Sequence, residues 1–177
     1  MIEPKQVFIL LLTVGFVSYS GACETLGLSR RPLVASLRTD SAEIGVQLSE
    51  YTYHAKIGFV YVNTTSGPVA KAGCGFPPLP GLEKKVDGKW VEAYYPVYAA
   101  CLTKPDYTLP SGGTYHGVLQ FLAFQPGHQA GPELRVDSID GVYRLEWDFV
   151  EGTDVSVKNA RRVNAISNEF RMVLTER

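Results

Sequence analysis

Apolar and polar residues alternate with a period of two along most of the chain. This period predicts β-strands that bury one face, and almost no segment shows the longer period of an amphipathic helix. In 141–150 one face carries Tyr143, Leu145, Trp147 and Phe149, and the other carries Arg144, Glu146 and Asp148. The same pattern marks further strands at 33–39, 42–48, 55–65, 114–124 and 168–175. The segment 55–65 is apolar on both faces, which is typical of a strand covered on both sides.

A tight hairpin is predicted at 82–93. Asp87-Gly88 lies between two alternating arms, and this dipeptide favours a two-residue hairpin turn. Val86 and Trp90 should lie near the turn, and Lys84, Lys85 and Lys89 should be solvated. About seven short strands separated by turn residues indicate an antiparallel β-sandwich.

The N-terminal residues 1–22 predict a cleaved signal peptide. Lys5 precedes the apolar run 7–17, which is shorter than the roughly 20 residues of a membrane-spanning helix. Small residues at Ser20, Gly21 and Ala22 provide a cleavage site. The alternative is a buried strand or helix of a cytosolic domain.

The residues before Cys23 resemble the lipobox of bacterial lipoproteins. Gly21, Ala22 and Cys23 match its pattern, and Ser20 departs from it, because leucine is usual there. The resemblance implies cleavage before Cys23, lipidation of that cysteine and a firm membrane anchor, since two acyl chains already suffice. The expected location is the cell envelope, outside the cytoplasm. The alternative is ordinary cleavage after Ala22, which leaves a secreted protein with a free thiol.

This processing divides the chain into a signal peptide, a tether at 23–32 and a single β-domain at 33–177. It also explains the odd number of cysteines. If Cys23 carries lipid, Cys74 and Cys101 remain, and an oxidising compartment allows them to form a disulfide. Closing this loop of about 27 residues would contribute roughly 3–4 kcal/mol.

Composition excludes some function classes. The chain has 17 basic and 18 acidic residues, a net charge of −1, and no basic stripe, so nucleic acid is not an expected partner. His54, His116 and His128 lack metal-ligand spacing, and no nucleotide-binding or serine-hydrolase motif is present. We therefore predict no catalytic residues, no metal and no cofactor. An enzyme with an unrecognised site is the least favoured alternative.

Three tyrosines crowd the segment 92–101, namely Tyr94, Tyr95 and Tyr98. Tyrosine combines apolar area with a polar tip at low entropic cost, so it is favoured in recognition surfaces. The favoured interpretation is that the rings fold back over the open end of the sandwich. The alternative is that they form a binding surface, and they are the candidate binding residues.

An ordered set of short motifs resembles exported bacterial immunoglobulin-like domains, often carried on lipoproteins. The matching positions are Asn63, Cys74, Gly88, Trp90, Cys101, Gly141, Tyr143, Arg144, Ser167, Asn168 and Phe170. The resemblance implies an immunoglobulin-like sandwich of about seven to nine strands. In antibody domains a cysteine follows the corner tyrosine by two residues, whereas Leu145 holds that place here.

The predicted export and the immunoglobulin-like resemblance together imply two function classes. The favoured one is a non-enzymatic, membrane-anchored envelope module that binds an unknown protein or glycan or has a structural role. The alternative is a proteinase inhibitor or another regulator of envelope enzymes, because small bacterial inhibitors share the sandwich. Such an inhibitor would present the segment 75–100 to a protease.

Overall fold

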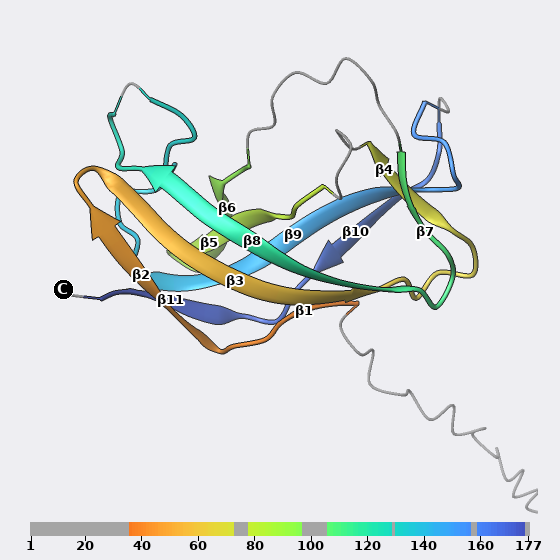
Figure 1. The fold of residues 1–177 in the computed structure, drawn as a ribbon, viewed down its shortest axis with the longest axis horizontal. Coiled ribbons are helices and arrows are strands. Elements are labelled where there is room, and N and C mark those ends of the chain that lie inside the picture. The colour runs from red at the N-terminus through yellow and green to blue at the C-terminus, as the bar shows by residue number, and fades with distance from the viewer. Residues whose placement is uncertain (1–35, 73–77, 97–105, 129, 157–158, 176–177) are drawn as a thin grey trace, which may run out of the picture. The chain divides into compact units, whose positions relative to one another are not determined.

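The computed structural model describes residues 36–72, 78–96, 106–128, 130–156 and 159–175, and the predicted leader, Cys23 and the tether lie outside them. These ranges contain β-strands and no helix, which confirms the all-β prediction (Figure 1). The described ranges contain no helix that could span a lipid bilayer. Their eleven strands are β1 (Leu37–Thr39), β2 (Glu43–Ser49), β3 (Thr52–Val62), β4 (Val69–Ala72), β5 (Gly81–Val86), β6 (Lys89–Tyr94), β7 (Asp106–Leu109), β8 (Thr114–Phe124), β9 (Gly141–Glu151), β10 (Arg162–Ile166) and β11 (Phe170–Leu174).

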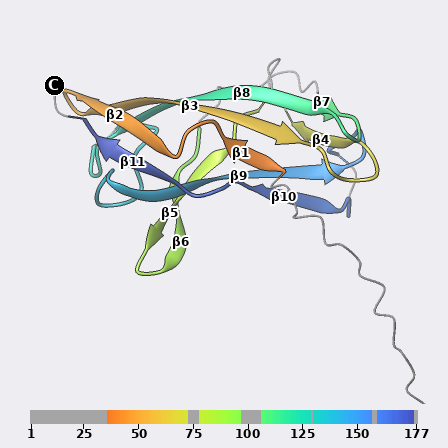
Figure 2. The same cartoon turned by 90° about the horizontal axis from the view of Figure 1, so that it is seen from below.

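The strands lie in two facing layers (Figure 2). In one layer, β3 pairs antiparallel with β8 along its whole length and with β1 at residues 59–61. The other layer is built around β9. Strand β2 belongs to both, because residues 43–46 pair with β11 and residues 47–49 pair with β3.

The β2–β11 pair is parallel, so the sheet is mixed and the prediction of a wholly antiparallel arrangement is wrong at this point. The alternation that identified both strands fixes which face is buried but carries no information on strand direction. Ile44 and Val46 are buried in the observed pairing, and the alternation would be the same with the opposite direction.

Strand β9 has partner strands on both of its edges. One edge meets β11 at residues 141–143 and β10 at residues 146–150. The other edge meets β5 at residues 143–146 and β4 at residues 150–151. The regular alternation of β9 has a different cause: one face packs against the other layer and is buried, whereas the opposite face is partly exposed.

Three strands were not predicted, namely β4, β7 and β10. They have four, four and five residues and no clear alternation of apolar and polar side chains. These three strands form because neighbouring strands pair with them. Strands β4 and β10 pair with β9, and β7 pairs with β4. Tertiary pairing thus specifies short strands that propensity does not.

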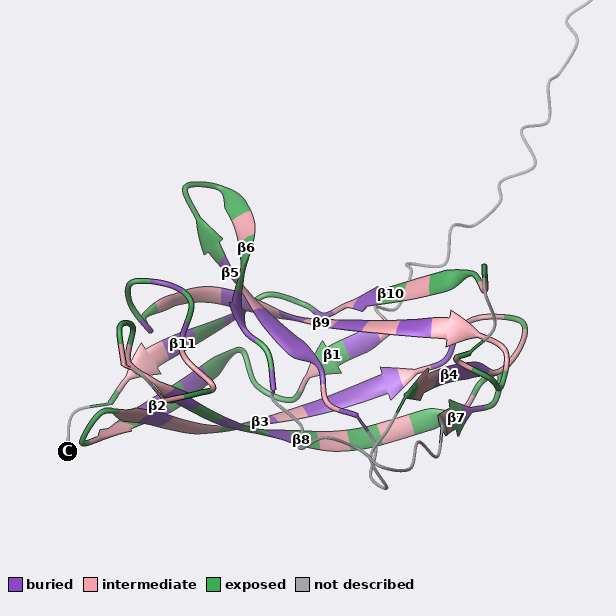
Figure 3. Ribbon diagram, turned by 90° about the horizontal axis from the view of Figure 1, so that it is seen from above, coloured by how far each residue is buried: buried purple, intermediate pink, exposed green. Residues whose placement is uncertain are grey.

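Aromatic side chains from the two layers form the centre of the core. Phe59 on β3 meets Trp147 on β9 edge-on, with ring centroids 5.4 Å apart. Tyr61 stacks on Phe149 with centroids 4.6 Å apart. These are favourable aromatic geometries, and all four rings are buried. The face of β9 that carries Tyr143, Leu145, Trp147 and Phe149 is buried as predicted (Figure 3). Strand β3 was predicted to be covered on both faces, and this is wrong at Lys56, which is exposed on its second face.

The predicted hairpin is confirmed as β5–β6, and its tip projects from the body of the domain (Figures 2 and 3). Asp87 and Gly88 have φ angles of 49° and 77°. A two-residue turn with both φ values positive matches the right-handed twist of the arms, and this explains the choice of residues.

Lys84 is buried, with 7% of its surface exposed, so the prediction that it is solvated is wrong. Its Nζ donates to the backbone oxygen and to the hydroxyl of Ser138, at 2.7 and 2.9 Å. Burial lowers the pKa of Lys84, while Asp140 and Asp137 act in the opposite direction. The stem packs over Gly141, where a Cβ would lie only 2.6 Å from the lysine Cε.

Candidate functional site

Tyr94 faces the core. It is 3% exposed, and its ring meets Phe121 of the opposite layer with centroids 4.8 Å apart. Burial raises its pKa, and a hydrogen bond with the backbone of Leu122 acts in the opposite direction. A ring enclosed in this way offers no contact area to a partner, so Tyr94 leaves the candidate binding surface.

Tyr95 points to the other side and is 41% exposed. Successive side chains of an extended chain face opposite sides, which separates it from its neighbour. The ring lies against Gly81, where a Cβ would be 3.2 Å from the tyrosine Cδ2. It borders a depression of about 150 Å³ that is also lined by Gly81, Leu82, Glu92, Glu146 and Asp148.

The depression is acidic, but its carboxylates are paired. Glu92 contacts Arg135, Glu146 accepts a hydrogen bond from Asn164 at 2.7 Å, and Asp148 pairs with Lys71 and Arg162. Burial raises the pKa of Tyr95, and the charges of Asp148 and Glu146 raise it further. The phenol therefore remains a neutral hydrogen-bond donor at physiological pH.

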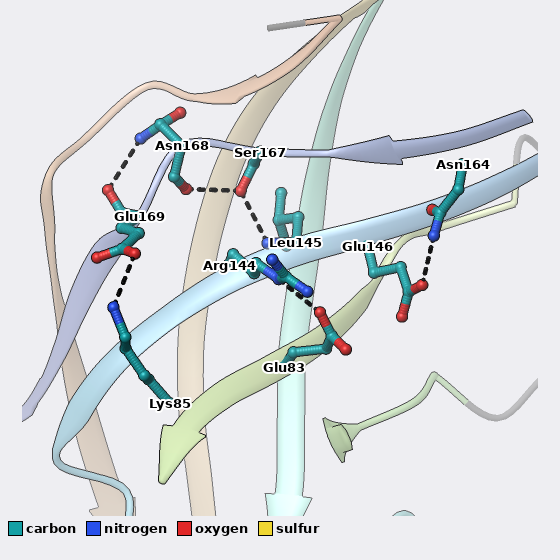
Figure 4. Close-up of polar contacts among 9 residues, drawn as sticks. All are labelled: Glu83, Lys85, Arg144, Leu145, Glu146, Asn164, Ser167, Asn168 and Glu169. Carbon is teal, nitrogen blue, oxygen red and sulfur yellow. Dashed lines mark hydrogen bonds and ion pairs between the residues drawn. The ribbon is translucent and has the colours of Figure 1, made fainter. Parts of the chain in front are cut away.

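The Trp90 ring makes cation–π contacts with two side chains. The Arg144 guanidinium carbon is 4.3 Å from the ring centroid, and the Lys85 Nζ is 5.4 Å from it, both within cation–π range. Arg144 also pairs with Glu83 at 2.6 Å, and Lys85 pairs with Glu169 at 3.2 Å (Figure 4). These contacts join the hairpin to β9 and to Glu169, the residue before β11.

Asn63, which matches a position in the immunoglobulin-like motif set, is fully buried and holds two turns together. Its amide donates to the backbone oxygens of Gly67 and Leu109, at 2.9 and 3.0 Å. Its side-chain oxygen accepts from the backbone N–H of Thr65 at 3.0 Å. The side chain thus has a complete structural role.

Ser167 and Asn168 join β9, β10 and β1. The Ser167 hydroxyl accepts from the Leu145 N–H at 2.8 Å and donates to the Asn168 backbone oxygen at 2.7 Å (Figure 4). The Asn168 side chain accepts from the Thr39 N–H and donates to the Thr39 hydroxyl, both at 2.9 Å. These residues replace ladder hydrogen bonds where the chain passes from β10 to β11.

The motif residues are therefore committed to the fold wherever the structure describes them. Cys74 and Cys101 lie outside the described residues, and their disulfide stays a prediction. Tyr98 and Cys23 also lie outside them, so the three-tyrosine cluster is reduced to Tyr95.

The histidines do not converge. His54 is on β3 and His116 is on β8, and they face different partners, Gln47 with Leu122 and Val60 respectively. His128 follows β8 and lies against Phe124 with ring centroids 4.9 Å apart. Within the ranges that the structure describes, no group of three or more histidine, cysteine or acidic side chains could hold a metal ion.

Comparison with known proteins finds no matching family model, no matching curated protein and no matching solved structure.

Sequence reasoning missed the residues that surround Tyr95. Glu146 and Asp148 were placed correctly on the outward face of β9, but their proximity to Glu92 depends on how β6 folds beside β5. The sequence did contain one indication of this site. Glu146 and Asp148 alternate on the outward face of 141–150, which predicts two carboxylates side by side on that face.

Proposed function

We propose that this chain is a non-enzymatic immunoglobulin-like module of the bacterial cell envelope, anchored through lipid on Cys23. Two features support the fold assignment. The layers face each other across an aromatic core, and Tyr143 at the start of β9 donates its hydroxyl to the Ile139 backbone oxygen at 2.8 Å. A tyrosine bonded to backbone a few residues upstream is the tyrosine corner of immunoglobulin-type sandwiches.

The proposed role is recognition of a protein partner at the face around Tyr95. The observation that carries it is a single exposed ring bordering an acidic depression between β5, β6 and β9. A lysine or arginine side chain of a partner could place its charge near the carboxylates and its stem against the ring. Hot spots are commonly aromatic residues of this kind, bordered by polar groups.

Crosslinking in intact envelopes tests this role. A bifunctional reagent should join the wild-type protein to a partner, and Tyr95→Ala should abolish the product. Tyr51→Ala is the matched control, because Tyr51 is 60% exposed on the turn between β2 and β3. Equal crosslinking by all three proteins would refute recognition at Tyr95.

The anchor is tested separately by fractionation. Wild-type protein should sediment with membranes, and Cys23→Ser should be found in the soluble fraction or remain unprocessed. Processed, soluble wild-type protein would refute the lipid anchor without bearing on the Tyr95 face.

A proteinase inhibitor is the second candidate, and the projecting β5–β6 hairpin favours it (Figure 2). Its tip exposes Val86 and Val91, each at 37%, as a protruding segment that a protease cleft could accept. A panel of proteases assayed with the purified protein separates the two functions. Absence of inhibition at micromolar concentration would remove this candidate.

A further inference from the structure

A second hollow, of about 480 Å³, lies on the layer opposite Tyr95. It forms because β2 leaves β3 to join β11. Strand β3 pairs with β2 up to His54 and with β1 from Phe59 onward, so residues 55–58 have no strand partner on that side among the described residues. The volume falls within the range of small-ligand sites, roughly 300–1,000 Å³.

Four of the polar side chains that line this hollow have no partner in the part of the chain that the structure describes. Gln47, His54, Lys56 and Gln120 line it, and within the described residues none of their side chains has a hydrogen bond or an ion pair. Four neighbouring polar side chains without protein partners can bind a ligand without breaking an internal contact.

The charge of the hollow selects an anion. Lys56 supplies the positive charge, and none of the described lining residues is acidic. The two glutamine amides and the imidazole add donors and acceptors suited to hydroxyl groups. A ligand that matches these groups has a carboxylate to pair with the lysine ammonium and several hydroxyls to bond to the glutamine amides. A polyhydroxylated acid has both.

The walls add shape and an apolar contact. Thr175 packs closely over Gly45, where a Cβ would lie 3.0 Å from the threonine methyl. Thr175 is held in place by its hydroxyl, which donates to the Val46 backbone oxygen at 3.0 Å. Leu122, which is 42% exposed, offers an apolar surface for the face of a sugar ring.

We infer that this hollow binds an acidic saccharide, with the sugar carboxylate on Lys56 and its hydroxyls on Gln47 and Gln120. The site is independent of the recognition proposed at Tyr95, because it uses β2, β3 and β8 and the end of the chain after β11.

Titration of the full-length protein with D-glucuronate, followed by amide chemical shifts in NMR, tests the inference. Saturable shifts should map to the residues that line the hollow. Lys56→Met should bind about tenfold more weakly or worse, which corresponds to a loss of one ion pair. Gln120→Ala should also weaken binding. Lys89→Met is the matched control, because it removes a lysine from the exposed hairpin and should leave the affinity unchanged.

Two further ligands identify the chemistry. D-glucose should bind at least tenfold more weakly than D-glucuronate, because it lacks the carboxylate. Acetate or inorganic phosphate binding as tightly as glucuronate would show a simple anion site and overturn the inference. No saturable shift at tens of millimolar glucuronate, or unchanged binding by Lys56→Met, would also overturn it. Tyr95→Ala should bind glucuronate normally, which separates this test from that of the proposed function.

Discussion

Lys84 and Asn63 place polar atoms in the interior and bond them to backbone oxygens. Lys84 was expected to be solvated, because the sequence could not show that Ser138, on the segment before β9, lies within reach of its Nζ. A lysine stem can lie along an apolar surface while its ammonium finds acceptors, so residue type alone does not decide exposure. The neighbouring Lys85 and Lys89 follow the expectation of solvation.

Tyr143→Phe should destabilise the fold by about 1–3 kcal/mol, because a buried carbonyl loses its donor. Tyr143 is fully buried, and its hydroxyl bonds to Ile139 at 2.8 Å. The phenylalanine ring keeps the packing against Phe170, so the change isolates the hydrogen bond. Urea unfolding followed by circular dichroism measures the loss.

Tyr51→Phe provides the comparison for this experiment, because the Tyr51 ring is largely exposed. Its unfolding midpoint should match the wild type. Equal midpoints for Tyr143→Phe and wild type would show that the corner hydrogen bond adds nothing to stability.

Among the elements, strands with strong alternation were predictable, and those fixed by their partners were not. Strand β9 and the β5–β6 hairpin carry their own signals in alternation and in Asp87-Gly88. Strands β4, β7 and β10 have no such signal. The interruption at Ser167 explains why the end of the chain forms two strands, since the serine hydroxyl there replaces a backbone acceptor.

Ser167→Ala should loosen the junction between β9, β10 and β11. The buried Leu145 N–H would lose its acceptor, at a cost of about 1–3 kcal/mol. Hydrogen exchange measured by NMR should show faster exchange of the Leu145 amide and of its neighbours on β9. Amides on the β3–β8 pair should change less, because they lie in the other layer.

Ser156→Ala is the matched control. The Ser156 hydroxyl bonds only locally, to Asp154 at 2.6 Å, and the residue is exposed. Exchange on β9 should then match the wild type. An unchanged Leu145 amide in Ser167→Ala would contradict the junction's dependence on the hydroxyl.

For the whole molecule, the candidate sites depend on strands that are distant in sequence. The separation of Tyr94 from Tyr95 follows from the period of two. The depression beside Tyr95 needs β5, β6 and β9 together, and the hollow at Lys56 exists because β2 passes from one layer to the other. Alternation reports the faces of single strands, so neither hollow could be read from the chain.

The buried tyrosines predict that the fold weakens at alkaline pH. Burial raises the pKa of Tyr61 from 10.0 to about 12, and it raises the pKa of Tyr143 as well. Above about pH 10 the unfolded chain loses phenolic protons that the fold retains, so stability is complete below that value and is lost as the pH rises through 12. Tyr61 alone accounts for about 1.4 kcal/mol at about pH 11.

Urea unfolding near pH 8 and near pH 11 measures this loss of stability. Two variants show which side chains cause it. Tyr61→Phe should lose less stability between the two conditions, because it has no phenol at position 61 to ionise in the unfolded chain. Lys84→Met should lose at least as much as wild type, since burial lowers the pKa of Lys84 and the unfolded chain then retains the extra proton as the pH rises toward 10.5. An unfolding free energy that does not fall between the two conditions would refute the prediction that buried phenols set the alkaline limit of the fold.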